Sequence, residues 1–279
     1  GTISKSSYPN VYEVTTHRET PRDMRDLEQL IKAYAAKAYC LVKGNPTKDL
    51  HKQSRAGTTD SSATTDWVCF DIDGLPSTVP ETFLAALSLS DVSYVIQYSA
   101  SYGIENKDLR CHIFMQLDKP MAAPLLKQWL IELNLTTPLL NSSIRLSKTG
   151  NALSWPLDIS ACQNDKLLYI SPPTLKGLRD PLPKNGRVQF VRKDKDTLTI
   201  NHAISTTAKN RERAHNRLDE LRDAEGLPKR KTSYRMHGGL EVMVKPDVCT
   251  VTEVRQERGF VYFNLNGGDS WAYYHPEDR

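Results

Sequence analysis

The spacing of apolar residues predicts a helix near the start of the chain. Five apolar side chains recur at intervals of three or four residues, which places them on one helical face. They are Met24, Leu27, Ile31, Tyr34 and Ala38. Thr20 is suited to cap this helix and Pro21 to occupy its first position. The pattern therefore predicts a helix that begins at Thr20.

Short apolar runs bounded by turn residues predict strands farther along the chain. These runs cover residues 38–42, 67–73, 92–99, 109–117 and 166–171, with helical patterns at residues 80–89 and 125–133. The polar residues 44–66 are expected to form a long loop, and such loops are often functional. This order of helices and strands predicts an α+β fold layered around one sheet.

A second region is expected after residue 180. Residues 181–196 are polar and contain Pro, Gly and Lys, which is typical of a domain boundary. A charged helix is predicted at residues 206–225, followed by strands at 240–244, 248–254 and 260–265. The sequence thus predicts two domains, residues 1–180 and 181–279, and the abrupt end suggests that the natural protein continues.

The composition is typical of a globular protein and predicts no membrane partner. Of the 279 residues, 39% are hydrophobic and 25% are charged. No apolar run approaches the roughly 20 residues that cross a bilayer. The five cysteines form no CxxC pair, and Cys40, Cys69 and Cys111 lie in apolar runs. We expect buried thiols in a reducing cytoplasm rather than disulfides or a zinc site.

Positive charge is concentrated in one segment. The net charge is +4, but residues 176–237 hold 16 Lys or Arg and 8 Asp or Glu, so this segment sums to +8 and the remainder to −4. A basic segment beside an acidic site suits a polyanionic ligand, because it neutralises phosphates that carboxylates repel. A solvated charged helix has the same composition, so charge alone leaves both interpretations open.

Two carboxylates stand at the end of an apolar strand. Asp71 and Asp73 end the run that starts at Trp67, and strand residues two apart project from the same face. Neighbouring like charges repel, and Mg²⁺ or Mn²⁺ neutralises such a pair through hard oxygen ligands. The apolar strand leading into the pair favours a fixed metal site over a solvated acidic turn.

A later strand carries two basic side chains on one face. Arg110 and His112 flank the apolar-facing Cys111, so the guanidinium and the imidazole point the same way. Both groups suit phosphate oxygens, although a lone strand histidine is more often a core residue bonded to a carbonyl. Ser99 and Ser101, in the turn before this strand, are further candidates for the same pocket.

A third acid lies farther along the chain. Asp158 stands between Leu157 and Ile159, and apolar neighbours on both sides are unusual for a surface carboxylate. A helix cap or an Asx turn ahead of Ser160 is the alternative. Upstream, Lys148 lies in a stretch rich in donors that suits either phosphate binding or a solvated loop.

In this order, the three elements resemble the archaeo-eukaryotic primase superfamily. That pattern is a hydrophobic residue with Asp-x-Asp, then a small or polar residue-x-His, then an Asp flanked by hydrophobic residues. Asp71 with Asp73, Arg110 with His112, and Asp158 match it in sequence order. Residues 98–103 and 169–173 look like primase-polymerases of phages, phage satellites and plasmids. The resemblance covers about residues 20–175 and departs at Arg110, where many members have Ser.

The resemblance implies a fold and a site. The fold is a primase-polymerase core with an RRM-like mixed or antiparallel sheet flanked by helices. Its three acids would hold two Mg²⁺ or Mn²⁺ ions, namely Asp71, Asp73 and Asp158. An incoming NTP or dNTP would be bound by His112 and Arg110, with Ser99, Ser101 and Lys148 as further candidates.

The resemblance also implies an activity and its partners. The reaction is template-directed nucleotidyl transfer, which makes or extends a primer on single-stranded DNA. The setting is replication of a phage or mobile element in the cytoplasm of a bacterial host, with a helicase domain expected downstream. The basic accessory region would grip the template or the primer's 5′ end; its candidate residues are Lys209, Arg211, Arg213, Arg217, Arg222, Lys229, Arg230 and Lys231.

Two other functions stay open on the sequence. A haloacid-dehalogenase-type phosphatase also starts from Asp-x-Asp, with Asp71 as its nucleophile, but Leu75 stands where that family has Thr or Val. A non-catalytic replication-initiator domain would bind DNA through the basic segment and keep the acids as structural residues. The sequence does not choose between ribonucleotides and deoxynucleotides.

Overall fold

The chain folds into two compact units. The computed structural model describes residues 13–44, 46–60, 62–104, 106–200, 203–228, 233–237, 240–244, 251–257, 260–265 and 271–274. The first unit comprises the chain up to Ser147 together with Leu153–Asn210, and the second comprises Lys148–Ala152 together with Arg211–Arg279. The division therefore lies near Asn210 rather than at the predicted residue 180.

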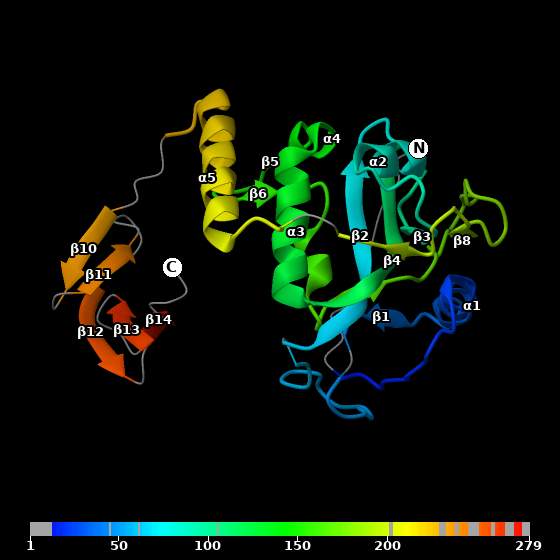
Figure 1. Cartoon of the computed structure of the whole chain (residues 1–279), viewed down its shortest axis with the longest axis horizontal. Coiled ribbons are helices and arrows are strands. Elements are labelled where there is room, and N and C mark those ends of the chain that lie inside the picture. The colour runs from blue at the N-terminus through cyan, green and yellow to red at the C-terminus, as the bar shows by residue number, and fades with distance from the viewer. Residues whose placement is uncertain are drawn as a thin grey trace. The chain divides into compact units, whose positions relative to one another are not determined.

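An antiparallel sheet forms the centre of the first unit (Figure 1). Its strands lie in the order β2-β4-β3-β8, and β9 pairs in parallel with β4. They are β2 (Thr64–Leu75), β3 (Tyr94–Tyr98), β4 (Leu109–Ala122), β8 (Val188–Val191) and β9 (Thr197–Leu198). With the helices that pack on this sheet, the predicted mixed α+β class is confirmed.

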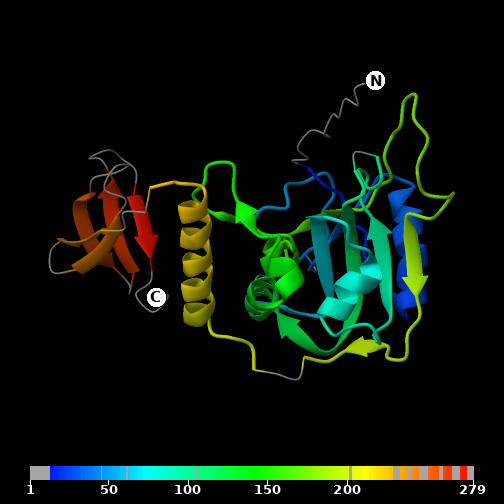
Figure 2. The same cartoon turned by 90° about the horizontal axis from the view of Figure 1, so that it is seen from above.

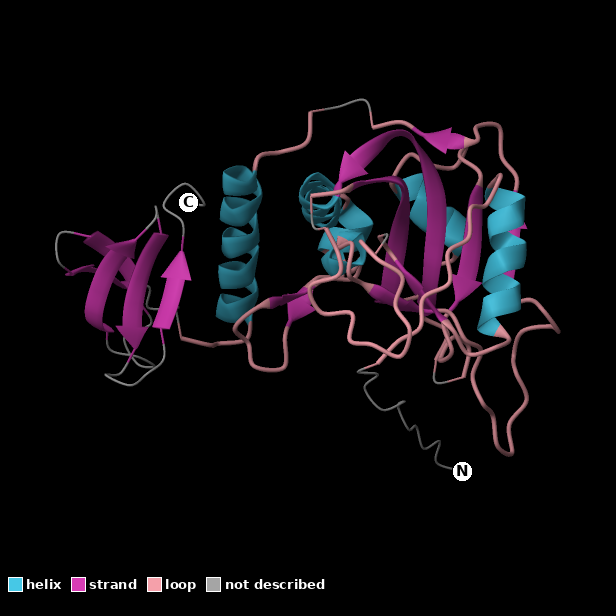
Figure 3. Cartoon of the chain, turned by 90° about the horizontal axis from the view of Figure 1, so that it is seen from below, coloured by secondary structure: helices cyan, strands magenta, loops and turns pink. Residues whose placement is uncertain are grey.

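Helices cover both faces of this sheet. α1 (Met24–Ala35) lies on one face, and α2 (Pro80–Ala86) and α3 (Ala123–Thr136) lie on the other (Figure 2). The view from the opposite side shows the same layers (Figure 3). α4 (Pro138–Asn141) follows α3. The sheet is therefore the middle layer of the first unit.

Two small antiparallel pairs complete the first unit. β1 (Cys40–Val42) pairs with β7 (Leu167–Tyr169), and β5 (Arg145–Leu146) pairs with β6 (Leu153–Ser154). A single 3₁₀ turn, η1 (Ile159–Cys162), precedes β7. Because Leu168 of β7 packs in the same apolar cluster as α1, the β1–β7 pair extends the cover of that face.

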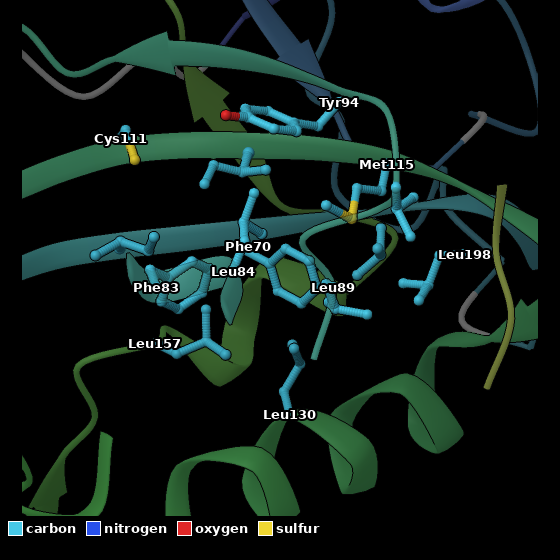
Figure 4. Close-up of a cluster of buried hydrophobic side chains, with 14 of the residues drawn as sticks. Phe70, Phe83, Leu84, Leu89, Tyr94, Cys111, Met115, Leu130, Leu157 and Leu198 are labelled. Carbon is cyan, nitrogen blue, oxygen red and sulfur yellow. The ribbon is translucent and has the colours of Figure 1, made fainter. Parts of the chain in front are cut away.

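The central strands are apolar at almost every position because both of their faces are covered. Phe70 packs against Phe83 of α2 and Trp129 of α3, with ring centroids 5.9 and 5.7 Å away. Figure 4 shows Phe70 and Phe83 in this cluster together with Leu130 and other buried side chains. A second cluster joins the opposite face of the sheet to α1. The continuous apolar runs in the sequence thus become strands buried on both sides.

The order of elements around the sheet is β-α-β-β-α, followed by a return to the sheet. β2, α2, β3, β4 and α3 follow one another along the chain. The chain then comes back alongside β2, where Leu157 forms an antiparallel bridge with Ile72. This return places the segment around Asp158 next to β2, on the side away from β4.

Two boundaries predicted from the sequence are wrong. The first helix is capped by Asp23, whose side chain accepts from the Asp26 N–H at 2.8 Å, and not by Thr20. Residues 181–196, predicted as a domain boundary, contain β8, which pairs with β3. Arg187 fixes this region by donating to Asp180 and to the Ser99 carbonyl. Pairing across the sheet therefore outweighs a polar, proline-containing local sequence.

The second unit contains the predicted charged helix and several strands. The elements are α5 (Thr207–Ala224, which begins in the first unit), β10 (Ser233–His237), β11 (Leu240–Val244), β12 (Val251–Glu257), β13 (Phe260–Leu265) and β14 (Trp271–Tyr274). β10 pairs with β11, and β12, β13 and β14 form an antiparallel sheet. The predicted strands at 240–244 and 260–265 are confirmed. Of the strand predicted at 248–254, residues 251–254 belong to β12, and residues 248–250 lie outside the described residues.

The cysteines described by the structure are free thiols. Cys69, Cys111 and Cys162 are buried, and Cys40 is half-buried. Burial raises the pKa of each of these four thiols. Cys249 lies outside the described residues. Within the described part of the chain, no helix is both long and apolar enough to cross a membrane.

A lysine is buried beneath the β1–β7 pair. Lys43 is 1% exposed, its Nζ donates to Thr65 Oγ1 at 2.6 Å, and it lies 4.1 Å from the centroid of the Trp67 ring. Burial lowers the pKa of Lys43 from 10.5 to about 8. The unfolded chain therefore holds this proton at pH values where the folded chain has released it, so the contribution of Lys43 to stability rises with pH.

We predict that Lys43→Met removes this pH dependence. The free energy of unfolding of the wild type minus that of Lys43→Met should rise by about 1.4 kcal/mol per pH unit between roughly pH 8 and 10. Urea unfolding at pH 8, 9 and 10 measures this difference. The exposed Lys37→Met should give a flat difference, and a flat difference for Lys43→Met would contradict the burial argument.

Candidate functional site

The strand register lines up four polar residues across one face of the sheet. Asp71 on β2 is paired with His112 on β4, and His112 with Gln97 on β3. On the other side of β2, the Asp158 N–H donates to the Asp71 carbonyl at 2.8 Å, next to the Ile72–Leu157 bridge. Cross-strand partners point to the same face, so Asp158, Asp71, His112 and Gln97 form one row. We call it the first row.

A second row lies one step nearer the end of β2. Asp73 is paired with Arg110 on β4, and the Ser99 N–H donates to the Arg110 carbonyl at 3.0 Å. These positions are two residues from those of the first row, so their side chains leave the same face. The two rows bring the predicted Asp71, Asp73, Asp158, Arg110 and His112 onto one surface.

The sheet face that carries the two rows becomes polar where α1 no longer packs on it. The next row inward on the same face is apolar and includes Cys69, Phe114 and Val95. These residues pack with Met24 and Ile31 of α1 in one buried cluster. The first row lies two residues farther along each strand, and there the same face is polar instead of apolar. The fold thus holds the two rows on a rigid, buried base.

Gln97 fixes the orientation of the His112 ring. Gln97 is fully buried, its Nε2 donates to the Tyr98 carbonyl at 2.6 Å, and its Oε1 lies 2.6 Å from His112 Nδ1. With the amide oriented in this way, His112 Nδ1 carries the proton that Gln97 Oε1 accepts. His112 Nε2 then faces Asp71, 3.4 Å from its Oδ1. The sequence analysis missed Gln97, whose signal was a polar residue in an apolar strand.

Arg110 and Asp73 form an ion pair at the end of the second row. Arg110 Nη1 donates to Asp73 Oδ1 at 2.9 Å, and the Asp73 side chain is 75% exposed. Arg110 Nε is buried and has no partner among the residues that the structure describes. Gly74, at φ +96°, leaves room for the guanidinium, because a Cβ there would lie 3.1 Å from Arg110 Nη2. The guanidinium thus keeps one donor for a further acceptor.

Lys166 neutralises Asp158. Lys166 Nζ donates to Asp158 Oδ2 at 2.8 Å and to Ser160 Oγ at 2.7 Å, while Asp158 Oδ1 accepts from the Ser160 N–H at 2.8 Å. Burial raises the pKa of Asp158, but the bonds from Lys166 and Ser160 outweigh it and hold this pKa below its usual value. The Asx turn ahead of Ser160, which the sequence offered as the alternative to a functional role for Asp158, is present. Lys166 was not predicted from the sequence.

Three acids therefore stand beside three bases. The pairs are Asp71 with His112, Asp73 with Arg110, and Asp158 with Lys166. Two carboxylates about 5 Å apart repel by about 3 kcal/mol at an effective dielectric constant of about 20. That repulsion exceeds a typical net hydrogen bond of about 1 kcal/mol, so a cation must offset it. Arg110 and Lys166 supply that charge within the chain, and His112 adds to it only when both of its ring nitrogens carry a proton.

The acids have the donor chemistry of a Mg²⁺ or Mn²⁺ site, but their carboxylates point to separate partners. Within the described ranges, no three His, Cys, Asp or Glu side chains are grouped so that they could hold a metal ion. The register nevertheless places Asp71 between Asp73 on its own strand and Asp158 on the adjacent segment. Hard cations prefer such oxygen donors, so the chemistry of these residues fits a divalent cation.

The other predicted residues have different positions. Ser99 and Ser101 are half-buried in the turn after β3, and their hydroxyl oxygens are 3.5 Å apart. Lys148 is exposed and belongs to the second unit, so the register does not bring it to the two rows. The Lys229, Arg230 and Lys231 patch lies outside the described residues.

The basic residues of α5 differ in exposure. Lys209 and Arg211 are exposed, whereas Arg213 and Arg217 are half-buried, and Arg217 pairs with Glu220 at 3.0 Å. Arg222, predicted as a DNA contact, is instead 8% exposed and donates to the Gly150 and Pro228 carbonyls. This arginine ties the end of α5 to neighbouring loops.

The residues of the two rows differ in exposure. Gln97 and His112 are buried, Asp71, Arg110 and Asp158 are half-buried, and Asp73 is exposed. A cavity of about 750 Å³ lies elsewhere in the first unit, between the loop around Gly57, the start of α3 and the segment around Gln163. None of the residues of the two rows lines it.

Comparison with known proteins adds no identity. The chain matches no family model, no curated protein and no solved structure. The geometry of the two rows therefore carries the functional argument by itself.

We predict that Gln97→Leu destabilises the protein through His112. The substitution removes the acceptor of the buried Nδ1 proton, which costs about 1–3 kcal/mol of unfolding free energy. Urea unfolding measures the loss, and ¹⁵N NMR of the His112 ring should show a changed tautomer population. Gln189→Leu on the exposed face of β8 is the matched control, with an effect within about 0.5 kcal/mol. Equal effects of the two substitutions would contradict the assigned role.

Proposed function

We propose that this protein is a DNA primase-polymerase that carries out metal-dependent, template-directed nucleotidyl transfer. The observation that carries the proposal is the pair of rows on one sheet face. Asp71, Asp73 and Asp158 lie there beside Arg110 and His112. Carboxylates for divalent cations and basic groups for phosphates are the two requirements of this chemistry.

The acids and the bases take complementary roles in this proposal. Asp71, Asp73 and Asp158 would hold two Mg²⁺ or Mn²⁺ ions, which supply activation of the attacking hydroxyl and stabilisation of the leaving pyrophosphate. His112, oriented by Gln97, directs Nε2 toward the same surface, and Nε2 would donate to a phosphate oxygen when both ring nitrogens carry a proton. Arg110 offers the terminal N–H groups of its guanidinium fork.

The order of elements supports an RRM-like core. The sequence β-α-β-β-α with a return beside β2 is the order of the ferredoxin-like arrangement, to which RNA-recognition sheets are related in form. In this order the acidic strand β2 is the edge strand of the sheet, paired with β4 on one side and joined on the other side to the Asp158 segment by the Ile72–Leu157 bridge. The strand β4 and the Asp158 segment could both supply further ligands, which is what a three-acid site needs.

The proposed partners follow from the same chemistry. A single-stranded DNA template, a primer and an NTP or dNTP are polyanions that suit the basic segment and this sheet face. Replication of a phage or mobile element in a bacterial host, with a helicase domain downstream, is the setting that the resemblance implies. A phosphatase or a non-catalytic initiator would lack template-dependent incorporation, so one assay separates these functions.

We predict that Asp71→Asn abolishes nucleotide incorporation. Incorporation of labelled nucleotides on single-stranded DNA with Mn²⁺ should fall by about 10³-fold or more, because the carboxylate that joins both rows is lost. Asp66→Asn on the exposed part of β2 is the matched control and should retain full activity. DNA affinity should be unchanged in both variants, since the acids do not contact the DNA backbone.

The other outcomes discriminate between the functions. Phosphate release from a generic phosphomonoester that Asp71→Asn abolishes would favour the phosphatase. DNA binding without incorporation or phosphate release would favour the initiator domain.

We predict that the exposed start of α5 contributes to DNA binding. Reversing the charge of Lys209 and Arg211 should weaken affinity for single-stranded DNA and lower the slope of log K against log [salt] by about 0.7 for each lost phosphate contact. Fluorescence anisotropy over a range of NaCl concentrations measures both quantities. Charge reversal at the exposed Lys119 of β4 is the control. Unchanged affinity and slope would exclude α5 as a DNA contact.

A further inference from the structure

Lys166 holds an unusual place in the candidate site. Its Nζ is 2.8 Å from Asp158 Oδ2, and Asp158 is the direct neighbour of Asp71 in the first row. The Lys166 and Asp158 side chains are 27% and 33% exposed, so the pair is partly shielded from water. A positive charge thus lies beside two adjacent carboxylates, where a divalent cation would otherwise be needed.

The main chain of Lys166 is fixed by backbone hydrogen bonds, whereas its side chain is held only at its end, by the bonds from Nζ to Asp158 and Ser160. The Lys166 N–H donates to the Gln163 carbonyl at 2.9 Å, and the Lys166 carbonyl accepts from the Lys43 N–H at 3.0 Å. Both bonds hold the start of β7 in place. The ammonium is a point charge on a flexible four-carbon stem with three donors, so it can change partners without backbone movement.

Lys166 differs from the other two bases of the site. Arg110 pairs with Asp73, which is 75% exposed, so water already screens that contact. His112 Nε2 is 3.4 Å from Asp71, and Gln97 holds its ring from behind. Lys166 combines the shortest contact to an acid of the first row with a flexible four-carbon stem. It is therefore the base that can exchange partners most readily.

We propose that Lys166 is an internal counter-ion that a divalent cation displaces from Asp158, and that the displaced ammonium then binds the phosphates of the nucleotide. This inference rests on the proposed function, because it takes the nucleoside triphosphate and the divalent cation from it. In the metal-free chain, Lys166 satisfies Asp158 and offsets the repulsion from Asp71. When a cation takes that place, one positive charge is released beside the surface that receives the triphosphate.

The exchange makes the cation and the triphosphate bind cooperatively. The cation alone must compete with Lys166 for Asp158, whereas the triphosphate offers Lys166 a new partner. Linkage requires that each ligand then increases the affinity of the other by the same factor. Lys166 would thereby keep the site from holding metal firmly without its nucleotide.

Two binding measurements on the full chain test the exchange. The first titrates Mn²⁺ alone and follows free Mn²⁺ by electron paramagnetic resonance. Lys166→Met should bind Mn²⁺ about tenfold more tightly than the wild type, the change expected for loss of one competing charge-assisted hydrogen bond. Lys166→Arg, which keeps the charge, should stay near the wild type. Lys195→Met, which breaks the exposed pair with Asp91, is the matched control and should have no effect.

The second measurement titrates a non-hydrolysable nucleoside triphosphate at saturating Mn²⁺. Here Lys166→Met should bind about tenfold more weakly than the wild type, because the released ammonium is missing. The opposite signs of the two effects exclude a merely structural role, since misfolding would weaken both ligands.

The failures of the two proposals are distinguishable. If the wild type binds Mn²⁺ in an Asp71-dependent manner but Lys166→Met binds it equally or less tightly, the exchange is overturned while the proposed function stands. The exchange is also overturned if Lys166→Met binds the triphosphate as tightly as the wild type does. If the wild type binds no Mn²⁺, or Asp71→Asn binds it normally, both proposals fail.

Discussion

The antiparallel register between β2 and β4 is the constraint on which the candidate site depends. It pairs Asp71 with His112 and Asp73 with Arg110, so each acid meets a base from the neighbouring strand. A shift of β2 by one residue would turn Asp71 and Asp73 toward the opposite face, which is packed against α2 and α3, and would separate them from His112 and Arg110. The buried clusters on both sides of the sheet fix this register, and the packing of the core thereby sets the chemistry of the surface.

The three carboxylates on this rigid surface need neighbouring groups that offset their negative charge. Each acid has a basic partner within the chain, and the partly buried Asp158 has the most complete set of donors. The same three bases are the groups that a polyanionic ligand would use. In the proposed function, neutralisation in the free protein and recognition of phosphates would be two uses of one set of side chains.

The sequence predicted much of the first unit because its signals were local. Continuous apolar runs gave β2, β3 and β4, and alternation placed Asp71 with Asp73 and Arg110 with His112 on common faces. Which strands are neighbours was not readable, because pairing depends on contacts between distant residues. For the same reason β8 was taken for a linker, Gln97 was not connected with His112, and Lys166 was not connected with Asp158. Arg222 was misread because its charge suggested solvent, whereas two backbone carbonyls bury it.

The central claim is that the acids on this sheet face hold divalent cations. Anomalous diffraction from crystals of the protein soaked with Mn²⁺ tests it most directly. The account predicts Mn²⁺ peaks within about 2.3 Å of carboxylate oxygens of Asp71, Asp73 and Asp158. It also predicts that Lys166 Nζ has moved away from Asp158. Mn²⁺ peaks only at other positions, with the three acid–base pairs intact, would contradict it.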